Sequence, residues 1–153
     1  MQLSLHADYA LRVLLYAGSH PAATVTTRQI SEAYGISRNH LVRVVHTLSE
    51  QGYVKVTPGR SGGLSLAKDP GQIRLGQVVR YAEPNLRLVE CFDRKTNTCP
   101  IIDTCGLKAP LRKALEAFLN ELDKYTLGDL LKGSRGAAMA SALVQLSHTA
   151  PHL

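Results

Sequence analysis

The spacing of the apolar residues changes once in the first half of the sequence, at Gly52, and this change constrains the fold more than any other feature. Before Gly52, apolar residues recur at every third or fourth position, which predicts amphipathic helices over 3–17, 26–33 and 37–51. Over 53–66 the pattern alternates on either side of a glycine-rich segment, which predicts a β-hairpin. Helices followed by a hairpin in this order predict a winged helix-turn-helix, in a chain that is mainly α with a small β-hairpin.

The second half of the sequence contains one long regular pattern. After Pro110 the apolar residues are spaced by 4, 3, 4 and 3 positions, and they are Leu111, Leu115, Phe118, Leu122 and Tyr125. This heptad-like seam predicts a long C-terminal dimerisation helix, near 108–126, that packs against a helix of a partner chain. The remainder is rich in glycine, alanine and serine, so we expect a flexible tail that leaves room only for a marginal helix around 137–147.

These patterns divide the chain into four parts. The winged helix-turn-helix domain spans 1–76, and a connecting element with the cysteine loop spans 77–107. The dimerisation helix with its cap spans 108–132, and the flexible tail spans 133–153. The length of the chain allows one domain of ordinary size plus an appendage, with a real hydrophobic core.

The net charge favours a polyanionic partner. The 153 residues carry 18 Lys and Arg against 12 Asp and Glu, which gives a formal net charge of +6 and an isoelectric point near 9.4. Nucleic acid is the first candidate for such a partner, and an anionic membrane surface is the second. The segment 1–18 lacks a charged leader with a cleavage site, and no run approaches the ~18 apolar residues that span a bilayer. We therefore expect a cytoplasmic protein without a membrane partner.

The third predicted helix carries side chains suited to DNA. In a helix-turn-helix the second helix of the motif enters the major groove, and its N-terminal residues reach the base edges. The residue types at the start of this helix and near the hairpin glycines bind bases and phosphates. The predicted DNA-binding residues are Ser37, Arg38, Asn39, His40, Arg43, Lys55, Arg60 and Ser61. A merely solvated helix face is the alternative.

Three cysteines, Cys91, Cys99 and Cys105, lie in a polar segment without a regular period. An odd number cannot all pair within one chain, so a disulfide framework does not account for them. Three thiolates in an irregular loop can converge on a zinc ion or an iron–sulfur cluster, and unrelated thiols are the alternative. A fourth ligand is missing, and Asp93 and Asp103 are nearby carboxylates in the sequence. A weakly bound carboxylate there would leave one iron open to a small diatomic molecule.

No catalytic motif accompanies these features. The sequence lacks a glycine-rich phosphate loop, an H-E-x-x-H motif and a nucleophile elbow. Its histidines and its 6 tyrosines are dispersed, so the tyrosines form no stacking platform for single-stranded nucleic acid. We therefore expect a binding protein and not an enzyme.

Four stretches of the sequence resemble a known family. They are MQLSLHADYALRVLLYA, YGISRNHLVRVVHTLSEQGYV, GRSGGLSLAK and ECFDRKTNTCPIIDTCGLKAPLRKALEAFLNELDKYTLGDLL, and together they span about 1–132. The chain resembles the iron–sulfur winged-helix repressors, and within that family it is most similar to the nitric-oxide-sensing members. The members that sense iron–sulfur biogenesis have a histidine ligand shortly after the third cysteine, where this sequence has Gly106-Leu107-Lys108.

The resemblance implies a repressor that binds an inverted-repeat operator in double-stranded DNA as a homodimer and is released when nitric oxide attacks its cluster. It implies one cluster per subunit, [4Fe–4S] or alternatively [2Fe–2S], held by Cys91, Cys99 and Cys105. It also implies Asp8 of the other subunit as the fourth ligand, with Arg12 free to pair with Asp8 when the cluster is absent. The alternative for Asp8 is an ordinary exposed acid in the first turn of a helix. A structural zinc, or a response to iron–sulfur status or redox stress, is the alternative for the function.

Overall fold

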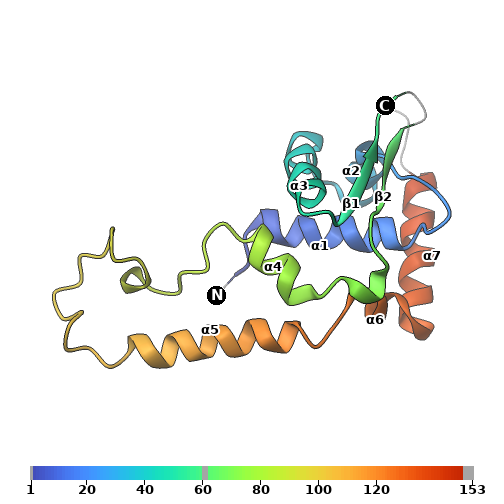
Figure 1. Ribbon diagram of the computed structural model, residues 1–153. Helices are drawn as coiled ribbons and strands as arrows, with labels where there is room; N and C mark the ends of the chain where they lie inside the picture. Colours follow the sequence, from blue (N-terminus) through green and yellow to red (C-terminus); the bar gives the residue numbers. More distant parts are fainter. Residues whose placement is uncertain (1, 60–61, 150–153) are drawn as a thin grey trace.

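The computed structural model describes residues 2–59 and 62–149 (Figure 1). In chain order its elements are α1 (Leu5–Gly18), α2 (Thr27–Tyr34), α3 (Arg38–Glu50), β1 (Val54–Thr57), β2 (Gly63–Leu66), α4 (Leu75–Ala82), α5 (Lys108–Leu122), α6 (Leu127–Leu131) and α7 (Gly133–Thr149), with short 3₁₀ turns at Pro70–Gln72 and Glu90–Phe92. This order confirms the predicted fold class, a mainly α chain with a winged helix-turn-helix. Throughout the described ranges, no helix is both long and apolar enough to cross a membrane.

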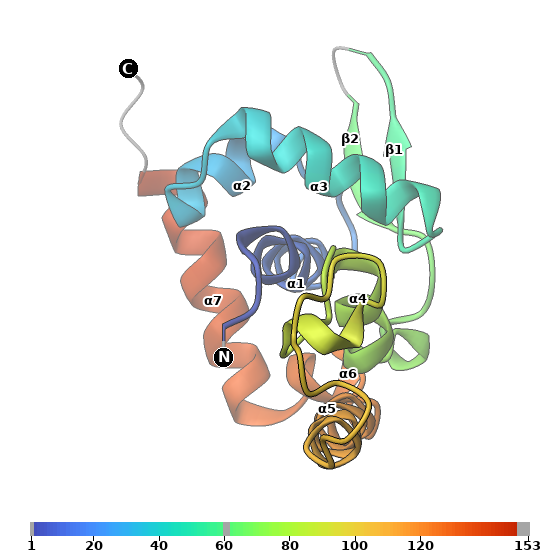
Figure 2. The same ribbon diagram turned by 90° about the vertical axis from the view of Figure 1, so that its left-hand side faces the viewer.

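Helix α1 lies at the centre of the fold, with α2 and α3 on one side of it and α4 on the other (Figure 2). Its inward residues are almost completely buried, and they are Ala7, Ala10, Val13, Leu14, Tyr16 and Ala17. The alanines let the neighbouring helices approach closely, while the larger side chains fill the space between them. Residues on α1 are therefore in a position to influence both α3 and the second half of the chain.

The helix-turn-helix follows from local signals in the sequence. The Thr26 hydroxyl accepts a hydrogen bond from the backbone N–H of Gln29 (3.2 Å), and the Gln29 side chain accepts one from the backbone N–H of Thr26 (2.7 Å). This capping box begins α2. Gly35 ends α2 with φ +65°, a conformation that glycine adopts without strain, and the chain then turns into α3.

The wing is a two-stranded antiparallel hairpin that continues into the body of the protein. Val54 pairs with Leu66 at its base and Thr57 with Gly63 towards its tip. The segment before α2 joins the hairpin, because the Val25 N–H donates to the Leu64 carbonyl (2.9 Å) and the Leu64 N–H donates to the Val25 carbonyl (2.7 Å). These bonds fix the wing next to the helix-turn-helix.

Helix α5 extends away from the body and is anchored near its C-terminal end (Figure 1). Arg80 of α4 donates to the carboxylate of Asp123, just after α5, at 2.6 Å. Leu119 is the buried apolar residue of α5. The predicted domain boundary at 76 falls inside α4, and because α4 packs against α1, the whole of α4 belongs with the winged-helix core.

The structure differs from the sequence-based prediction in the last segment. Instead of a flexible tail over 133–153, the described part forms α7, which packs against α2 and α6. Leu143 is only 5% exposed and belongs to the main core, and Met139, one turn earlier, packs against that core. Alanine favours helix strongly, and an apolar pair at i, i+4 then docks the helix. The glycine, alanine and serine content of this segment concealed both the helix preference and the apolar pair. Residues 150–153 lie outside the described ranges.

Candidate functional site

The outward face of α3 presents polar side chains that have no partner in the described part of the chain. Arg38, Asn39 and Arg43 are exposed, and no hydrogen bond or ion pair holds their side chains. The opposite face of the helix is buried and consists of Leu41, Val44, Val45 and Leu48. Because the apolar face fixes the orientation of the helix, the cationic and amide groups point outward, as the sequence predicts. Such groups can bind phosphates and base edges.

Ser37 stands at the N-cap position of α3 but makes no capping hydrogen bond with its side chain. The first N–H groups of α3 therefore lack a side-chain acceptor in the described structure. Arg38 and Asn39 next to them are exposed, so the N-terminal end of this 13-residue helix is open to solvent. An open helix N-terminus carries partial positive charge and binds phosphate well.

The wing places a second cationic group beside α3. Lys55 lies exposed on β1, and Gly59 at the tip has φ +110°, a conformation that favours glycine. Arg60 and Ser61, the other predicted contacts of the wing, lie outside the described residues. Their role in DNA binding stays a prediction.

His40 differs from the other predicted residues of α3. It is half-buried, and its ring packs edge-on against Tyr9 of α1, with the ring centroids 4.9 Å apart. Aromatic packing therefore turns the His40 ring towards α1, and the role of His40 in DNA binding stays a prediction. Its neighbour His6, which was not among the predicted functional residues, has its Nε2 3.2 Å from the hydroxyl oxygen of Thr47 on α3. Burial lowers the pKa of His6, and the adjacent His40 lowers it further, which favours a neutral ring.

All three cysteines line one cavity at the start of α5. Cys91, Cys99 and Cys105 are half-buried free thiols around a volume of about 200 Å³. The other residues of the wall are Val89, Glu90, Ile101, Leu107, Lys108 and Leu111. The fold thus brings the three predicted thiols to the same place. Across the described ranges, however, no three His, Cys, Asp or Glu side chains are already gathered as a metal-holding group.

The donor set of this cavity fits an iron–sulfur cluster or zinc. Thiolates prefer such centres to hard cations, and the apolar part of the wall limits the access of water. Glu90 is the carboxylate of the wall, and the Thr98 hydroxyl donates to it at 3.3 Å. Glu90 was not among the predicted ligands, although its position directly before Cys91 was a usable signal.

The two carboxylates considered from the sequence do not border the cavity. Asp93 accepts hydrogen bonds from the Lys95 backbone N–H (3.0 Å) and the Thr96 hydroxyl (3.1 Å), and pairs with Arg87 at 2.7 Å. These groups, the Lys95 N–H first, lower the pKa of Asp93. Asp103 is exposed. Neither carboxylate is therefore placed to complete a centre formed by the cysteines of the same chain.

Asp8 does not border the cysteine cavity of its own chain either, and it pairs with Arg12. The Arg12 Nη2 lies 2.8 Å from Asp8 Oδ2, and Arg12 Nε donates to Oδ1 at 3.2 Å. This pairing was predicted for a chain without a bound cluster. The two side chains are 41% and 38% exposed, so the ion pair is weak and Asp8 can exchange it for another partner at small cost.

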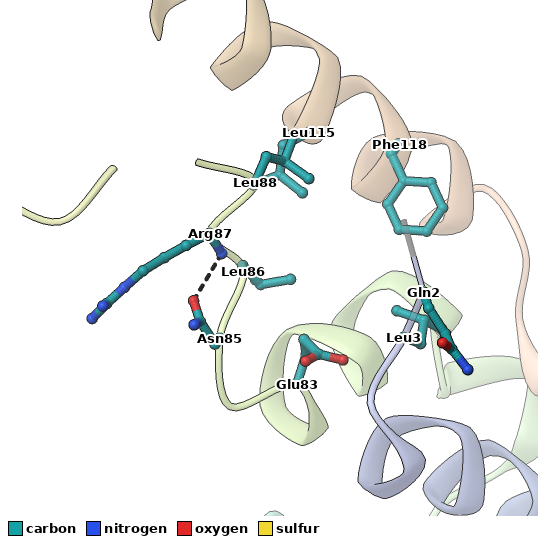
Figure 3. Close-up of a pocket in the computed structure, with 9 residues that line it drawn as sticks. All are labelled: Gln2, Leu3, Glu83, Asn85, Leu86, Arg87, Leu88, Leu115 and Phe118. Carbon is teal, nitrogen blue, oxygen red and sulfur yellow. Dashed lines mark hydrogen bonds between the residues drawn. The ribbon is translucent and has the colours of Figure 1, made fainter. Parts of the chain in front are cut away.

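The apolar seam of α5 is incompletely covered. Leu111, Leu115, Phe118 and Leu122 are half-buried, and Tyr125 is 48% exposed. Leu115 and Phe118 line a second cavity, of about 590 Å³, between α5, the N-terminal segment and residues 83–88 (Figure 3). A helix whose apolar row opens onto solvent and a cavity has surface left to pack against a partner.

The sequence of the chain matches those of known transcriptional regulators. The family model for Rrf2, described as an iron-dependent transcriptional regulator, matches residues 3–133. The HTH-type transcriptional regulator NsrR of Bacillus subtilis is 47% identical over 133 residues, which cover 86% of this chain and 91% of that protein. The HTH-type transcriptional regulator NsrR of Geobacillus kaustophilus is also 47% identical over 133 residues, 86% of this chain and 90% of that protein.

Solved structures share the fold. The structure of T. potens IscR matches with a TM-score of 0.68 at 24% identity, over 86% of each chain. The structure of CymR, the global cysteine regulator of B. subtilis, matches with a TM-score of 0.67 at 23% identity, over 85% of this chain and 95% of that one.

Proposed function

This chain belongs to the Rrf2 family of iron-dependent transcriptional regulators, and from that premise we propose that it is a nitric-oxide-sensing repressor with an iron–sulfur cluster in each subunit of a homodimer. It is a transcriptional regulator and not an enzyme. The observation that carries the sensing role is the single cavity lined by Cys91, Cys99 and Cys105. The protein acts in the cytoplasm, where it represses transcription from an inverted-repeat operator.

The DNA contacts come from α3 and the wing. Arg38, Asn39 and Arg43 are unpaired and exposed, so they bind base edges and phosphates without first breaking an internal contact. Ser37 and the open N-terminus of α3 bind a phosphate, and the wing, with Lys55, Arg60 and Ser61, binds the backbone next to it.

The cysteines hold the cluster as thiolates, with [4Fe–4S] as the main candidate and [2Fe–2S] as the alternative. When bound, the cluster supplies iron atoms with which nitric oxide reacts. The apolar wall around the thiols limits water while admitting a small uncharged molecule. The partner subunit's Asp8 is the proposed fourth ligand. Asp93 and Asp103 do not border the cavity of the same chain, and Glu90, the carboxylate of its wall, is the competing candidate.

The turn of α1 that carries Asp8 also contacts α3. His6 approaches the Thr47 hydroxyl (3.2 Å), and Tyr9 packs on His40, so two contacts join this turn to the DNA-reading helix. When Asp8 leaves the partner's site, Arg12 is in place to bind it, and the position of α1 against α3 changes. A coupling of ~3 kcal/mol is sufficient to change DNA affinity about 150-fold.

The homodimer places the two cysteine loops beside each other's α1 helices. The half-buried seam of α5, from Leu111 to Tyr125, packs against the same seam of a second copy. Its spacing of 4, 3, 4 and 3 positions is that of two helices packed along their length. Sensing therefore requires the dimer, because the cysteines and the fourth ligand come from different subunits.

The test uses the full-length protein, prepared without oxygen and supplied with iron and sulfide. Visible and resonance-Raman spectra report the cluster, and fluorescence anisotropy reports binding to a duplex selected from a random library by the same protein. We expect a coloured protein whose DNA affinity falls by about 150-fold as nitric oxide removes the cluster spectrum. A colourless protein with equal DNA affinity before and after nitric oxide refutes the proposal and favours a structural zinc. A response to an oxidant or to iron limitation, without one to nitric oxide, favours the other sensing role.

Two matched variants locate the fourth ligand. Asp8→Ala is expected to shift the cluster spectrum and shorten the lifetime of the cluster, whereas Glu90→Gln, a change within the cavity wall, is expected to leave both unchanged. If Glu90→Gln shifts the spectrum and Asp8→Ala does not, the fourth ligand comes from the same chain, and the proposed link between the subunits through Asp8 is wrong.

A further inference from the structure

Val42 stands out on the DNA-reading face of α3 because it is apolar and exposed. It is 57% exposed, while the apolar residues of the core face, Leu41, Val44, Val45 and Leu48, are buried. A single exposed valine is common on protein surfaces, so its exposure alone carries no function. Its neighbours on the helix make the position informative.

Three neighbours of Val42, Arg38, Asn39 and Arg43, are groups that the proposed function places on DNA, and a fourth neighbour is an exposed histidine. Arg38 and Asn39 lie one turn before it on the same face, Arg43 follows it directly, and His46, one turn later, has a side chain that is 72% exposed. Val42 is therefore at the centre of a polar surface that is expected to enter the major groove. A polar residue at this position would suit solvent better, and alanine would favour the helix more strongly.

The major groove contains one apolar feature, the C5-methyl group of thymine. A β-branched side chain in a helix strongly prefers one rotamer, so Val42 presents its two methyl groups with little loss of side-chain freedom on binding. We propose that Val42 reads a thymine methyl group in each half of the operator and is a specificity-determining residue. This inference rests on the proposed DNA-binding function and deepens it.

The dimer seam does not compete for this surface. Helix α3 lies on one side of α1, and α5 lies on the opposite side in both views (Figures 1 and 2). A second copy that packs along α5 therefore leaves Val42 open. The groups proposed to bind phosphate, at Ser37 and on the wing, lie on either side of the α3 face that carries Val42. This arrangement suits binding in a DNA groove better than binding to a protein partner.

The test replaces single thymines by uracil, which removes only the methyl group and keeps the base-pairing edge. Full-length protein is used to select a duplex from a random library, and each thymine of one half-site is then replaced in turn. Wild-type protein is expected to lose about fourfold in affinity at one position, the value of burying one methyl-sized group. The Val42→Ala protein is expected to bind the thymine and uracil duplexes with less than about a twofold difference, since its side chain no longer reaches the methyl.

The control is Leu130→Ala, which truncates an exposed apolar side chain on α6, away from α3, and is expected to keep the fourfold difference. Val42 is more than half exposed and alanine favours the helix more strongly, so the melting temperature of Val42→Ala should not fall below that of the wild type. If Val42→Ala keeps the fourfold difference, or if wild type shows none at any position, the inference is wrong while DNA binding stands. If no duplex is selected at all, the proposed function fails as well, and the two failures are thereby distinguished.

Discussion

The docking of α7 can be tested with two leucines on the same helix. Leu143 is 5% exposed and Leu146 is 46% exposed, so Leu→Ala at both positions makes the same chemical change in two environments. The change removes roughly three carbon groups, worth about 2.4 kcal/mol when buried at about 0.8 kcal/mol each. Incomplete collapse of the cavity brings the expected cost of Leu143→Ala to about 3 kcal/mol. At Leu146 about half of the transfer energy is lost, and solvent fills the gap, which predicts about 1 kcal/mol. The change in helix propensity is common to both variants and cancels.

The measurement is thermal and urea unfolding of both variants, at one protein concentration and without a bound metal, so that dimerisation and ligand binding contribute equally. A difference of about 2 kcal/mol corresponds to a melting temperature about 4–8 °C lower for Leu143→Ala than for Leu146→Ala. Because α7 packs on α2, Leu143→Ala should also weaken DNA binding more than its control does. Equal melting temperatures for the two variants would show that α7 does not pack against α2 as described, and the reasoning would be refuted.

Three further perturbations test other parts of the structure. A Cβ at Gly76 would collide with the Asp123 carboxylate and a backbone oxygen of α5, so Gly76→Ala should lower the free energy of unfolding in urea by about 1–3 kcal/mol. The control Gly106→Ala, with open space around it, should lower it by less than about 0.5 kcal/mol. Equal losses in the two variants would contradict the close α4–α5 contact. Arg43→Ala should make the dependence of log affinity on log salt shallower by about 1 per subunit, and an unchanged slope would remove Arg43 from the phosphates. Burial raises the pKa of Tyr34 to about 12, so the folded protein holds a proton that the unfolded chain releases near pH 10. The free energy of unfolding should therefore fall as pH rises from about 10 to about 12, and by less in Tyr34→Phe; an identical fall in both proteins would exclude this cause.

Local sequence patterns predicted most of the architecture. The capping box at Thr26 and the turn at Gly35 act over a few residues, so their outcome depends little on distant parts of the chain. The same is true of the change in period at Gly52 and of the cap of α6, where Thr126 and Asp129 bond each other's backbone N–H groups. Local patterns failed for α7, because its glycine, alanine and serine content suggested a flexible tail and concealed a helix that docks through Leu143.

The sequence by itself determined which residues are available for the candidate site: a cationic start of α3, three thiols and a carboxylate on α1. The tertiary structure decided how they are used. It brought Cys91, Cys99 and Cys105 to one cavity, turned His40 towards Tyr9, and left Val42 exposed among free cations. The physical reason is that helix period and turn preference are set by neighbours along the chain, whereas burial and side-chain direction are set by whichever distant element packs against the residue.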